Sequence, residues 1–196
     1  MEIKLKFSKL VPDIWNKLGE IPRSGWIKRG IENPENDQEH TIACRDLVVS
    51  LRDELTEFSD EDINEILDII EVHEYPETIE GDPITADLTE EEKKKQRSEK
   101  FVRERNAMYK ICGKIGGSVG PEIFVYWLRF EKREDNNADF AKQIDWYQSI
   151  EKAWQYQQEG NKVLVQDFIN SYRKDIIHPA LVKRKLKIEE LSKKID

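Results

Sequence analysis

The sequence predicts an all-α fold, because its apolar residues follow helical spacing along nearly the whole chain and strand patterns are almost absent. The 9 Gly and 7 Pro residues are few for a chain of 196 and cluster between the helical stretches. This length suits one domain, since domains typically have about 50–250 residues. We therefore expect residues 1–196 to form a single bundle of about seven helices, with an N-terminal helix within residues 1–20.

Two helices are expected in the N-terminal part of the chain. The first covers residues 9–18, and a loop rich in Gly and Pro follows over residues 21–31. Asp37 can cap the second helix through its side-chain oxygens. The second helix has one apolar stripe with steps of three or four residues, formed by His40, Cys44, Leu47, Leu51, Leu55 and Phe58.

The next helix is expected after Ser59, which together with Asp62 resembles a capping box with Asp in place of Glu. Its apolar stripe consists of Ile63, Ile66, Leu67 and Ile70. The same stripe then continues into His73, Glu74 and Glu77. A core-facing stripe that becomes ionisable at one end costs free energy unless a partner neutralises it. A metal ion is the simplest such partner.

The C-terminal half is expected to be helical as well. Pro76 ends or kinks the preceding helix, and a charged helix follows over residues 90–111. A loop is expected over residues 113–120, after which Pro121 suits the first turn of another helix. That helix is broken at residues 135–137, and the last helices are expected over residues 139–158, 163–172 and 179–191.

The composition excludes several classes of protein. With 32 Lys and Arg against 40 Asp and Glu, the net charge is −8, which disfavours a nucleic-acid polymer as partner, because binding to phosphates needs clustered cations. No apolar run approaches the roughly 20 residues that span a bilayer. Cys44 and Cys112 are too few for a disulfide scaffold. We expect a soluble, cytoplasmic protein that binds neither nucleic-acid polymers nor membranes.

His40, the pair His73-Glu74 and a distant carboxylate can together bind a divalent cation. Imidazole nitrogens combined with carboxylate oxygens suit Mn, Fe, Co, Ni or Zn. Asp145 lies on a largely apolar helix and is therefore the natural fourth ligand. A single His on an apolar face is more often a hydrogen-bonded core residue. Here His40 and His73 lie on consecutive helices, and Glu74 and Glu77 follow His73, so the pattern favours a metal site.

Other catalytic motifs do not fit the sequence. His73-Glu74 begins like the H-E-x-x-H motif of zinc proteases, but Glu77 stands where the second His is required, and Pro76 interrupts the helix. The glycine-rich stretch over residues 113–120 does not match the phosphate-binding pattern G-x-x-x-x-G-K-S/T. No Ser or Cys lies in a recognisable nucleophile elbow.

Six short segments carry a resemblance to a known family. They are Ile-Pro-Arg-Ser-Gly-Trp at 21–26, Asn33-Pro-Glu35 with Glu39-His40, Val72-His-Glu-Tyr-Pro-Glu77, Gly81-Asp82, Gln143-Ile-Asp145 and His178-Pro179. In this order they resemble motifs of the HD-domain phosphohydrolases, specifically the small 5′-deoxynucleotidase group of the HD-domain-containing protein 2 type. The resemblance runs over residues 21–191. Each segment is weak alone, but six in register are specific.

The resemblance implies an HD-domain helical bundle that binds one divalent metal ion through His40, His73, Glu74 and Asp145. The metal would be Mn, Co, Fe, Ni or Zn, with Mg as a further candidate. The implied substrate is a small nucleotide, and proteins of this group typically form homodimers. One departure concerns the dyad that gives the family its name, because position 74 has Glu where the family has Asp. Glu is one methylene longer, so its carboxylate reaches farther from the same backbone.

The resemblance also assigns roles to residues around the metal. Glu77 would act as general base toward the attacking water, and Asp82 would assist near the leaving group. Arg23 would contact phosphate or sugar, since a guanidinium suits oxyanions. Trp26 would face the sugar; the alternative is that its ring anchors the loop on the core.

The implied reaction is metal-dependent removal of the 5′-phosphate from (deoxy)nucleoside monophosphates. One alternative is the same scaffold acting on another nucleotide phosphoester, such as a deoxynucleoside triphosphate or a guanosine tetraphosphate alarmone. Another is a non-catalytic nucleotide-binding protein, which Glu74 and Pro76 favour because both alter the central motif.

Overall fold

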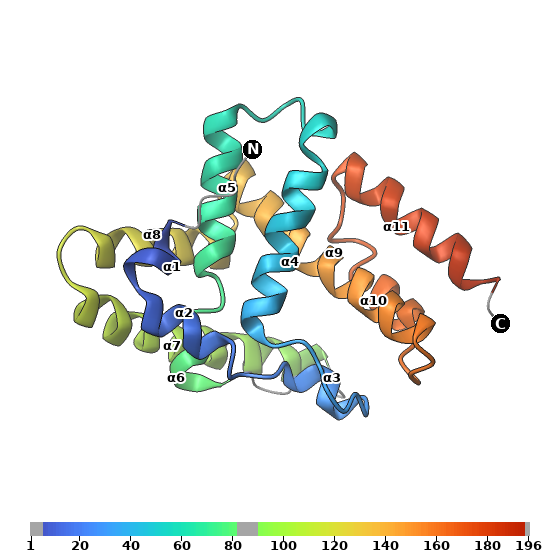
Figure 1. Cartoon of the computed structure of the whole chain (residues 1–196), viewed down its shortest axis with the longest axis horizontal. Coiled ribbons are helices and arrows are strands. Elements are labelled where there is room, and N and C mark those ends of the chain that lie inside the picture. Colours follow the sequence, from blue (N-terminus) through green and yellow to red (C-terminus); the bar gives the residue numbers. More distant parts are fainter. Residues whose placement is uncertain (1–5, 82–89, 195–196) are drawn as a thin grey trace.

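The computed structural model describes residues 6–81 and 90–194, and these ranges are helical apart from turns and one isolated antiparallel bridge between Pro22 and Asn36 (Figure 1). The all-α prediction is confirmed. The helices are α1 (Phe7–Leu10), α2 (Pro12–Leu18), α3 (Ser24–Lys28), α4 (Asp37–Ser50), a 3₁₀-helix η1 (Arg52–Glu54), α5 (Asp60–Val72), α6 (Glu77–Glu80), α7 (Glu90–Ile115), α8 (Val119–Lys132), α9 (Asn136–Gln158), α10 (Val165–Ser171) and α11 (Pro179–Ser192).

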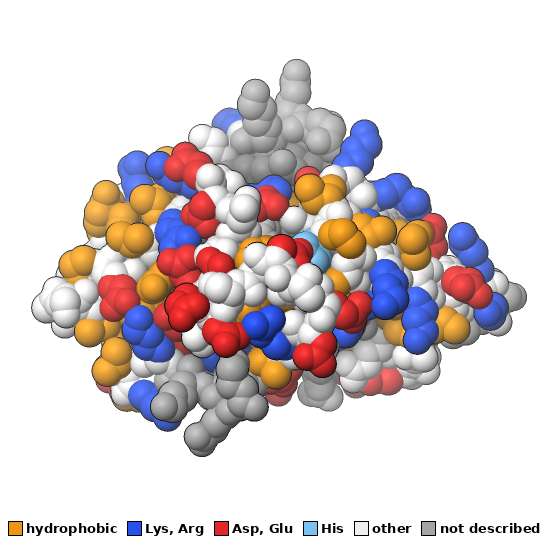
Figure 2. Space-filling model, turned by 90° about the horizontal axis from the view of Figure 1, so that it is seen from above, with side chains coloured by type: hydrophobic (Ala, Val, Ile, Leu, Met, Phe, Trp, Pro, Cys, Tyr) orange, Lys and Arg blue, Asp and Glu red, His pale blue; other side chains and the backbone are white. Residues whose placement is uncertain are grey.

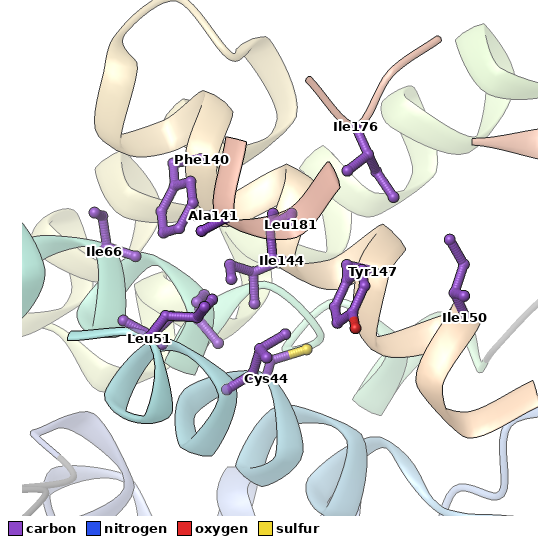
Figure 3. Close-up of a cluster of buried hydrophobic side chains, with 14 of the residues drawn as sticks. Cys44, Leu51, Ile66, Phe140, Ala141, Ile144, Tyr147, Ile150, Ile176 and Leu181 are labelled. Carbon is purple, nitrogen blue, oxygen red and sulfur yellow. The ribbon is translucent and has the colours of Figure 1, made fainter. Parts of the chain in front are cut away.

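Helix α5 packs against α4, α8 and α9, and lies beside α4 in Figure 1. Its two sides contribute to two hydrophobic clusters. The larger cluster joins α4, α5, α9, α10 and α11, and Figure 3 shows Cys44, Ile66 and Ile144 converging within it. The smaller cluster joins α1 and α2 to α7, α8 and the C-terminal end of α5, where Val72 and Tyr75 are fully buried. The end of α5 is therefore held from both sides.

The helix caps agree closely with the sequence pattern. Ser59 caps α5 and forms a reciprocal capping box with Asp62, as predicted. The cap of α4 is shifted by one residue from the prediction, because Asn36 is the N-cap and Asp37 is already helical. Asn36 is the cap because it forms a second capping box with Glu39: its side-chain oxygen accepts from the Glu39 N–H, and its own N–H donates to the Glu39 carboxylate.

Several predicted boundaries were wrong for local reasons. The first helix is divided into α1 and α2, because Pro12 begins a new helix and Val11 leaves the helical region with φ −132°. The loop over 21–31 contains the short helix α3. The expected helical stripe through Phe58 ends earlier, since α4 stops at Ser50 and η1 follows. Together with α6, these short elements account for most of the excess over the expected seven helices.

The expected loop over 113–120 is only a tight turn between α7 and α8, since α7 continues to Ile115 and α8 begins at Val119. Gly116 and Gly117 have positive φ values of 65° and 56°, which glycine adopts without strain. Gly120 is required for a different reason. A Cβ atom there would lie 2.3 Å from the carbonyl oxygen of Cys112, so only glycine lets the two helices approach this closely.

Within the described ranges, no helix is long and apolar enough to cross a membrane. The face shown in Figure 2 carries acidic and basic side chains intermingled with apolar ones. That face has no continuous basic surface of the kind that binds nucleic-acid polymers.

A buried ion pair fixes the last turn of α5. Glu71 is fully buried and accepts hydrogen bonds from Arg45 Nη1 at 3.0 Å and from the backbone N–H groups of Lys6 and Ser8 at 2.9 and 2.6 Å. Arg45 is itself only 2% exposed. One carboxylate thus ties α1 and α4 to the point where α5 ends.

We expect Arg45→Met to lower the free energy of unfolding by about 3–5 kcal/mol, because it leaves the Glu71 carboxylate buried without its cationic partner. Urea denaturation followed by circular dichroism measures this change. Arg52→Met is the matched control, since Arg52 pairs with Asp60 at the surface and its loss should change stability little. Equal effects of the two substitutions would contradict the assigned role of the buried pair.

Candidate metal centre

His73 follows the last residue of α5 and caps its C-terminal end. Its Nδ1 lies 2.6 Å from the carbonyl oxygen of Ile70, an acceptor, so Nδ1 carries the proton and donates it. In the neutral form of the ring, Nε2 then presents a lone pair. This atom is buried, makes no hydrogen bond within the described part of the chain and lies 3.3 Å from Glu74 Oε1. The ring packs on Phe130, with 4.8 Å between centroids.

His40 faces His73 from the first turn of α4 and is fully buried. Its Nδ1 lies 2.7 Å from Oε1 of Gln148, which comes from α9. With the Gln148 amide in this orientation Nδ1 donates here as well, so in the neutral form of the ring Nε2 carries a lone pair and no proton. Nε2 lies 3.2 Å from Asp145 Oδ1 and 3.6 Å from Glu74 Oε1, and the two imidazole centroids are 5.3 Å apart.

In their neutral forms, the two imidazoles therefore present their Nε2 lone pairs to the same region as the carboxylate oxygens of Glu74 and Asp145. The ligand atoms of His40, His73 and Glu74 lie within 4.8 Å of one another, and Asp145 adjoins the group through His40. Facing lone pairs repel one another in a buried site unless a cation lies between them. Metal-binding His residues typically donate the second ring N–H to an oxygen acceptor, which both imidazoles do here. The donor set fits a divalent transition metal.

The two carboxylates are held ionised by neighbouring cations. Burial opposes ionisation of Glu74, but the Arg23 guanidinium, in contact with Oε1, keeps the pKa of this carboxyl well below its usual range. Burial also opposes ionisation of Asp145, and the Lys142 ammonium 3.3 Å from Oδ2 outweighs it, so this pKa is lowered too. The pKa of Lys142 is raised in turn, because Asp145 outweighs its burial.

Glu77 begins α6 one turn after Glu74, and its backbone N–H donates to the Glu74 carbonyl at 3.0 Å. Its side chain is buried and its Oε1 lies 3.2 Å from the Lys100 ammonium of α7. Lys100 also contacts Glu104 at 3.0 Å. Burial alone would lower the pKa of Lys100, but Glu77 and Glu104 raise it. Pro76 precedes α6 as its N-cap, so α5 and α6 are separate helices, as the proline predicts.

The loop that carries Arg23 and Trp26 is joined to the segment before α4 by two backbone hydrogen bonds, from Arg23 N to Glu35 O and from Asp37 N to Ile21 O. Arg23 points to the site, where it contacts Glu74 and lies 3.6 Å from Asp37.

Trp26 has the packing of a loop anchor. It is 4% exposed, it stacks on Phe168 and meets the edge of Tyr156, and its indole N–H donates to Glu35 Oε1 at 3.0 Å. This is the alternative that the sequence left open for Trp26. Asp82 lies outside the described residues.

Three further residues near the two imidazoles were not predicted from the sequence. Gln148 and Lys142 lie three residues to either side of Asp145 on α9, so the helical period around that aspartate would have indicated both. Cys44 lies one turn after His40, with Sγ 3.7 Å from His40 Nε2. Burial raises the pKa of its thiol well above the usual value, which keeps it a neutral neighbour.

The comparison with protein families agrees with this geometry. A model of the HD domain family matches residues 15–191. The chain belongs to the HD domain family.

Curated relatives of this HD-domain chain are named 5′-deoxynucleotidases. It is 30% identical over 183 residues to 5′-deoxynucleotidase HDDC2 of Dictyostelium discoideum, which covers 90% of this chain and 93% of the relative. It is also 29% identical over 162 residues to 5′-deoxynucleotidase hdd1 of Schizosaccharomyces pombe, covering 80% of this chain and 76% of the relative.

Solved structures share the fold of this HD-domain chain. A predicted metal-dependent phosphohydrolase from Magnetospirillum magnetotacticum superposes with a TM-score of 0.72 at 20% identity, covering 96% of this chain and 91% of the other. The PH0347 protein from Pyrococcus horikoshii gives a TM-score of 0.69 at 18% identity, with 94% and 98% covered.

Replacing one imidazole tests whether the HD-domain chain binds metal at these residues. We expect His73→Ala to weaken binding of Mn²⁺ or Co²⁺ by more than about 100-fold, since loss of a ligand exceeds the 10–100-fold cost of losing an outer partner. Isothermal titration calorimetry of the metal-stripped protein measures this affinity. His178→Ala is the matched control, because His178 pairs with Glu57 outside the cluster. Unchanged affinity in His73→Ala would exclude this ligand set.

Proposed function

We propose that this HD-domain protein is a metal-dependent phosphohydrolase that removes the 5′-phosphate from deoxynucleoside monophosphates. The proposal rests on the arrangement of the two imidazoles. Their Nε2 atoms face Glu74 and Asp145, while their Nδ1 atoms donate to Gln148 and to the carbonyl of Ile70. The names of the curated relatives support the substrate class.

His40, His73, Glu74 and Asp145 would hold one divalent metal ion, with Mn, Co, Fe, Ni and Zn as candidates and Mg as a further one. When bound, such an ion supplies Lewis-acid polarisation of a phosphate oxygen and acidifies a water molecule. Glu74 in place of Asp is compatible with this role, because its Oε1 lies 3.3 Å from one Nε2 and 3.6 Å from the other.

The remaining residues supply charge and proton transfer. Glu77 would accept the proton of the attacking water, and Lys100 at 3.2 Å stabilises the charged carboxylate that this task requires. Arg23, whose guanidinium contacts Glu74, would offset charge on the phosphoryl oxygens. Asp82 would assist near the leaving group. Trp26 would act on the sugar side through the loop that it anchors.

Three broader expectations belong to the same proposal. Residues 1–196 would form a single HD domain, two copies would form a homodimer, and the protein would work in the cytoplasm on a free nucleotide.

Phosphate release from a panel of ribo- and deoxyribonucleoside monophosphates tests the activity. The protein is stripped of metal and supplied with Mn²⁺, Co²⁺, Mg²⁺ or Zn²⁺ in turn. We expect metal-dependent release that favours deoxy substrates. Pyrophosphate or tripolyphosphate from other nucleotides would instead identify another phosphoester as substrate. Absence of turnover with every metal and nucleotide would indicate a nucleotide-binding protein and would contradict the proposal.

Glu77→Ala separates proton transfer from metal binding. We expect it to keep metal affinity and to lower kcat by about 100-fold or more, the range of general-base catalysis. Steady-state phosphate release and isothermal titration of metal measure the two effects. Glu80→Ala, at the other end of α6, is the control and should retain activity. Normal turnover in Glu77→Ala would rule out this residue as the base.

A further inference from the structure

A chain of buried hydrogen bonds leads from His40 to a carboxylate outside the proposed metal site. His40 Nδ1 donates to Gln148 Oε1, and Gln148 Nε2 donates to Glu35 Oε2 at 3.0 Å. The other oxygen of Glu35 accepts from the indole N–H of Trp26. Gln148 and Glu35 are 3% and 5% exposed, so water does not compete freely for these groups.

The chemistry of the three groups makes this chain directional. An ionised carboxylate only accepts hydrogen bonds, whereas an amide accepts through oxygen and donates through nitrogen. Since Glu35 only accepts, it selects the orientation of Gln148 in which the NH₂ group faces Glu35. The amide oxygen then faces His40, which must donate from Nδ1. Lys152 Nζ lies 3.9 Å from Glu35 Oε2.

We propose that Glu35 is a positioning residue that sets the imidazole tautomer of His40 by fixing the orientation of the Gln148 amide. The consequence for metal affinity rests on the proposed function of the site, whereas the tautomer itself does not. Glu35 touches neither metal nor substrate in this account and acts only through Gln148. Trp26 contributes to the same orientation, because its indole N–H donates to the second oxygen of Glu35 and an indole cannot turn to offer an acceptor instead.

Glu35→Gln is the variant that distinguishes this role from simple packing. The new amide has one oxygen for two donors, and the indole N–H of Trp26 cannot turn round. We expect the oxygen to face Trp26 and the new NH₂ group to face Gln148. Gln148 then inverts and offers its own NH₂ group to His40 Nδ1, which shifts the proton of His40 to Nε2.

The tautomers can be read directly by ¹⁵N NMR of the imidazoles in the metal-stripped protein, at a pH high enough for both rings to be neutral. The chain has only 3 His residues, which makes assignment simple. His73 is the internal reference, because its Nδ1 donates to a backbone carbonyl and does not depend on Glu35. We expect Nδ1–H for His40 and His73 in the wild type, and a shift to Nε2–H for His40 alone in Glu35→Gln.

The double variant Glu35→Gln/Trp26→Phe provides the rescue. Without the indole N–H, the new amide can turn its oxygen to Gln148, so His40 should return toward Nδ1–H. A packing role for Glu35 predicts the opposite, since the double variant loses more contacts than the single one. Trp26→Phe alone should leave the tautomer of His40 unchanged.

Metal titration separates this inference from the proposed function. We expect Glu35→Gln to weaken Mn²⁺ binding by about 10–100-fold, the usual effect of losing an outer partner. A changed tautomer with unchanged affinity would support the role of Glu35 and count against His40 as a ligand. An unchanged tautomer in Glu35→Gln would overturn the inference. If that variant fails to fold, Gln148→Met replaces it and should abolish the Nδ1–H preference of His40.

Discussion

The functional site depends on one constraint: two buried imidazoles must present unprotonated Nε2 atoms to the same point. His73 meets it through the carbonyl of Ile70 in its own helix, and His40 meets it through Gln148 from another. The position of His73 follows from where α5 ends, and that end is fixed by the buried Glu71 carboxylate. The buried Glu71 carboxylate and the His73 imidazole thus both lie at the C-terminal end of α5, so a shift of that turn would move the imidazole.

Charge balance explains why so many ionisable groups are buried together. Glu74, Asp145 and Glu77 each have a cation nearby, namely Arg23, Lys142 and Lys100. Removing a carboxylate from water is costly unless such a partner is present. The three cations match the three carboxylates in number, so a bound divalent metal ion would supply the excess positive charge that suits an anionic phosphate.

The parts of the fold and of the candidate site that depend on local sequence signals were predictable. The capping box of α5, the break at Pro76 and the stripe that becomes ionisable at His73 follow from helix periodicity and capping chemistry. The short helices α1, α3 and α6 were missed or merged, because single turns leave no periodic signal. The helical period could have indicated that Gln148 lies near Asp145, but not its hydrogen bonds, because its partners are 108 and 113 residues away in sequence and only tertiary packing brings them together.

The central claim is that His40 and His73 bind one metal ion through Nε2. The most direct test is anomalous diffraction from crystals soaked in Mn²⁺. The account predicts one strong peak in contact with Nε2 of both imidazoles and with carboxylate oxygens of Glu74 and Asp145, at about 2.0–2.3 Å, typical of transition-metal ligands. A map without a peak between the two imidazoles, or a metal ion bound elsewhere on the chain, would contradict it.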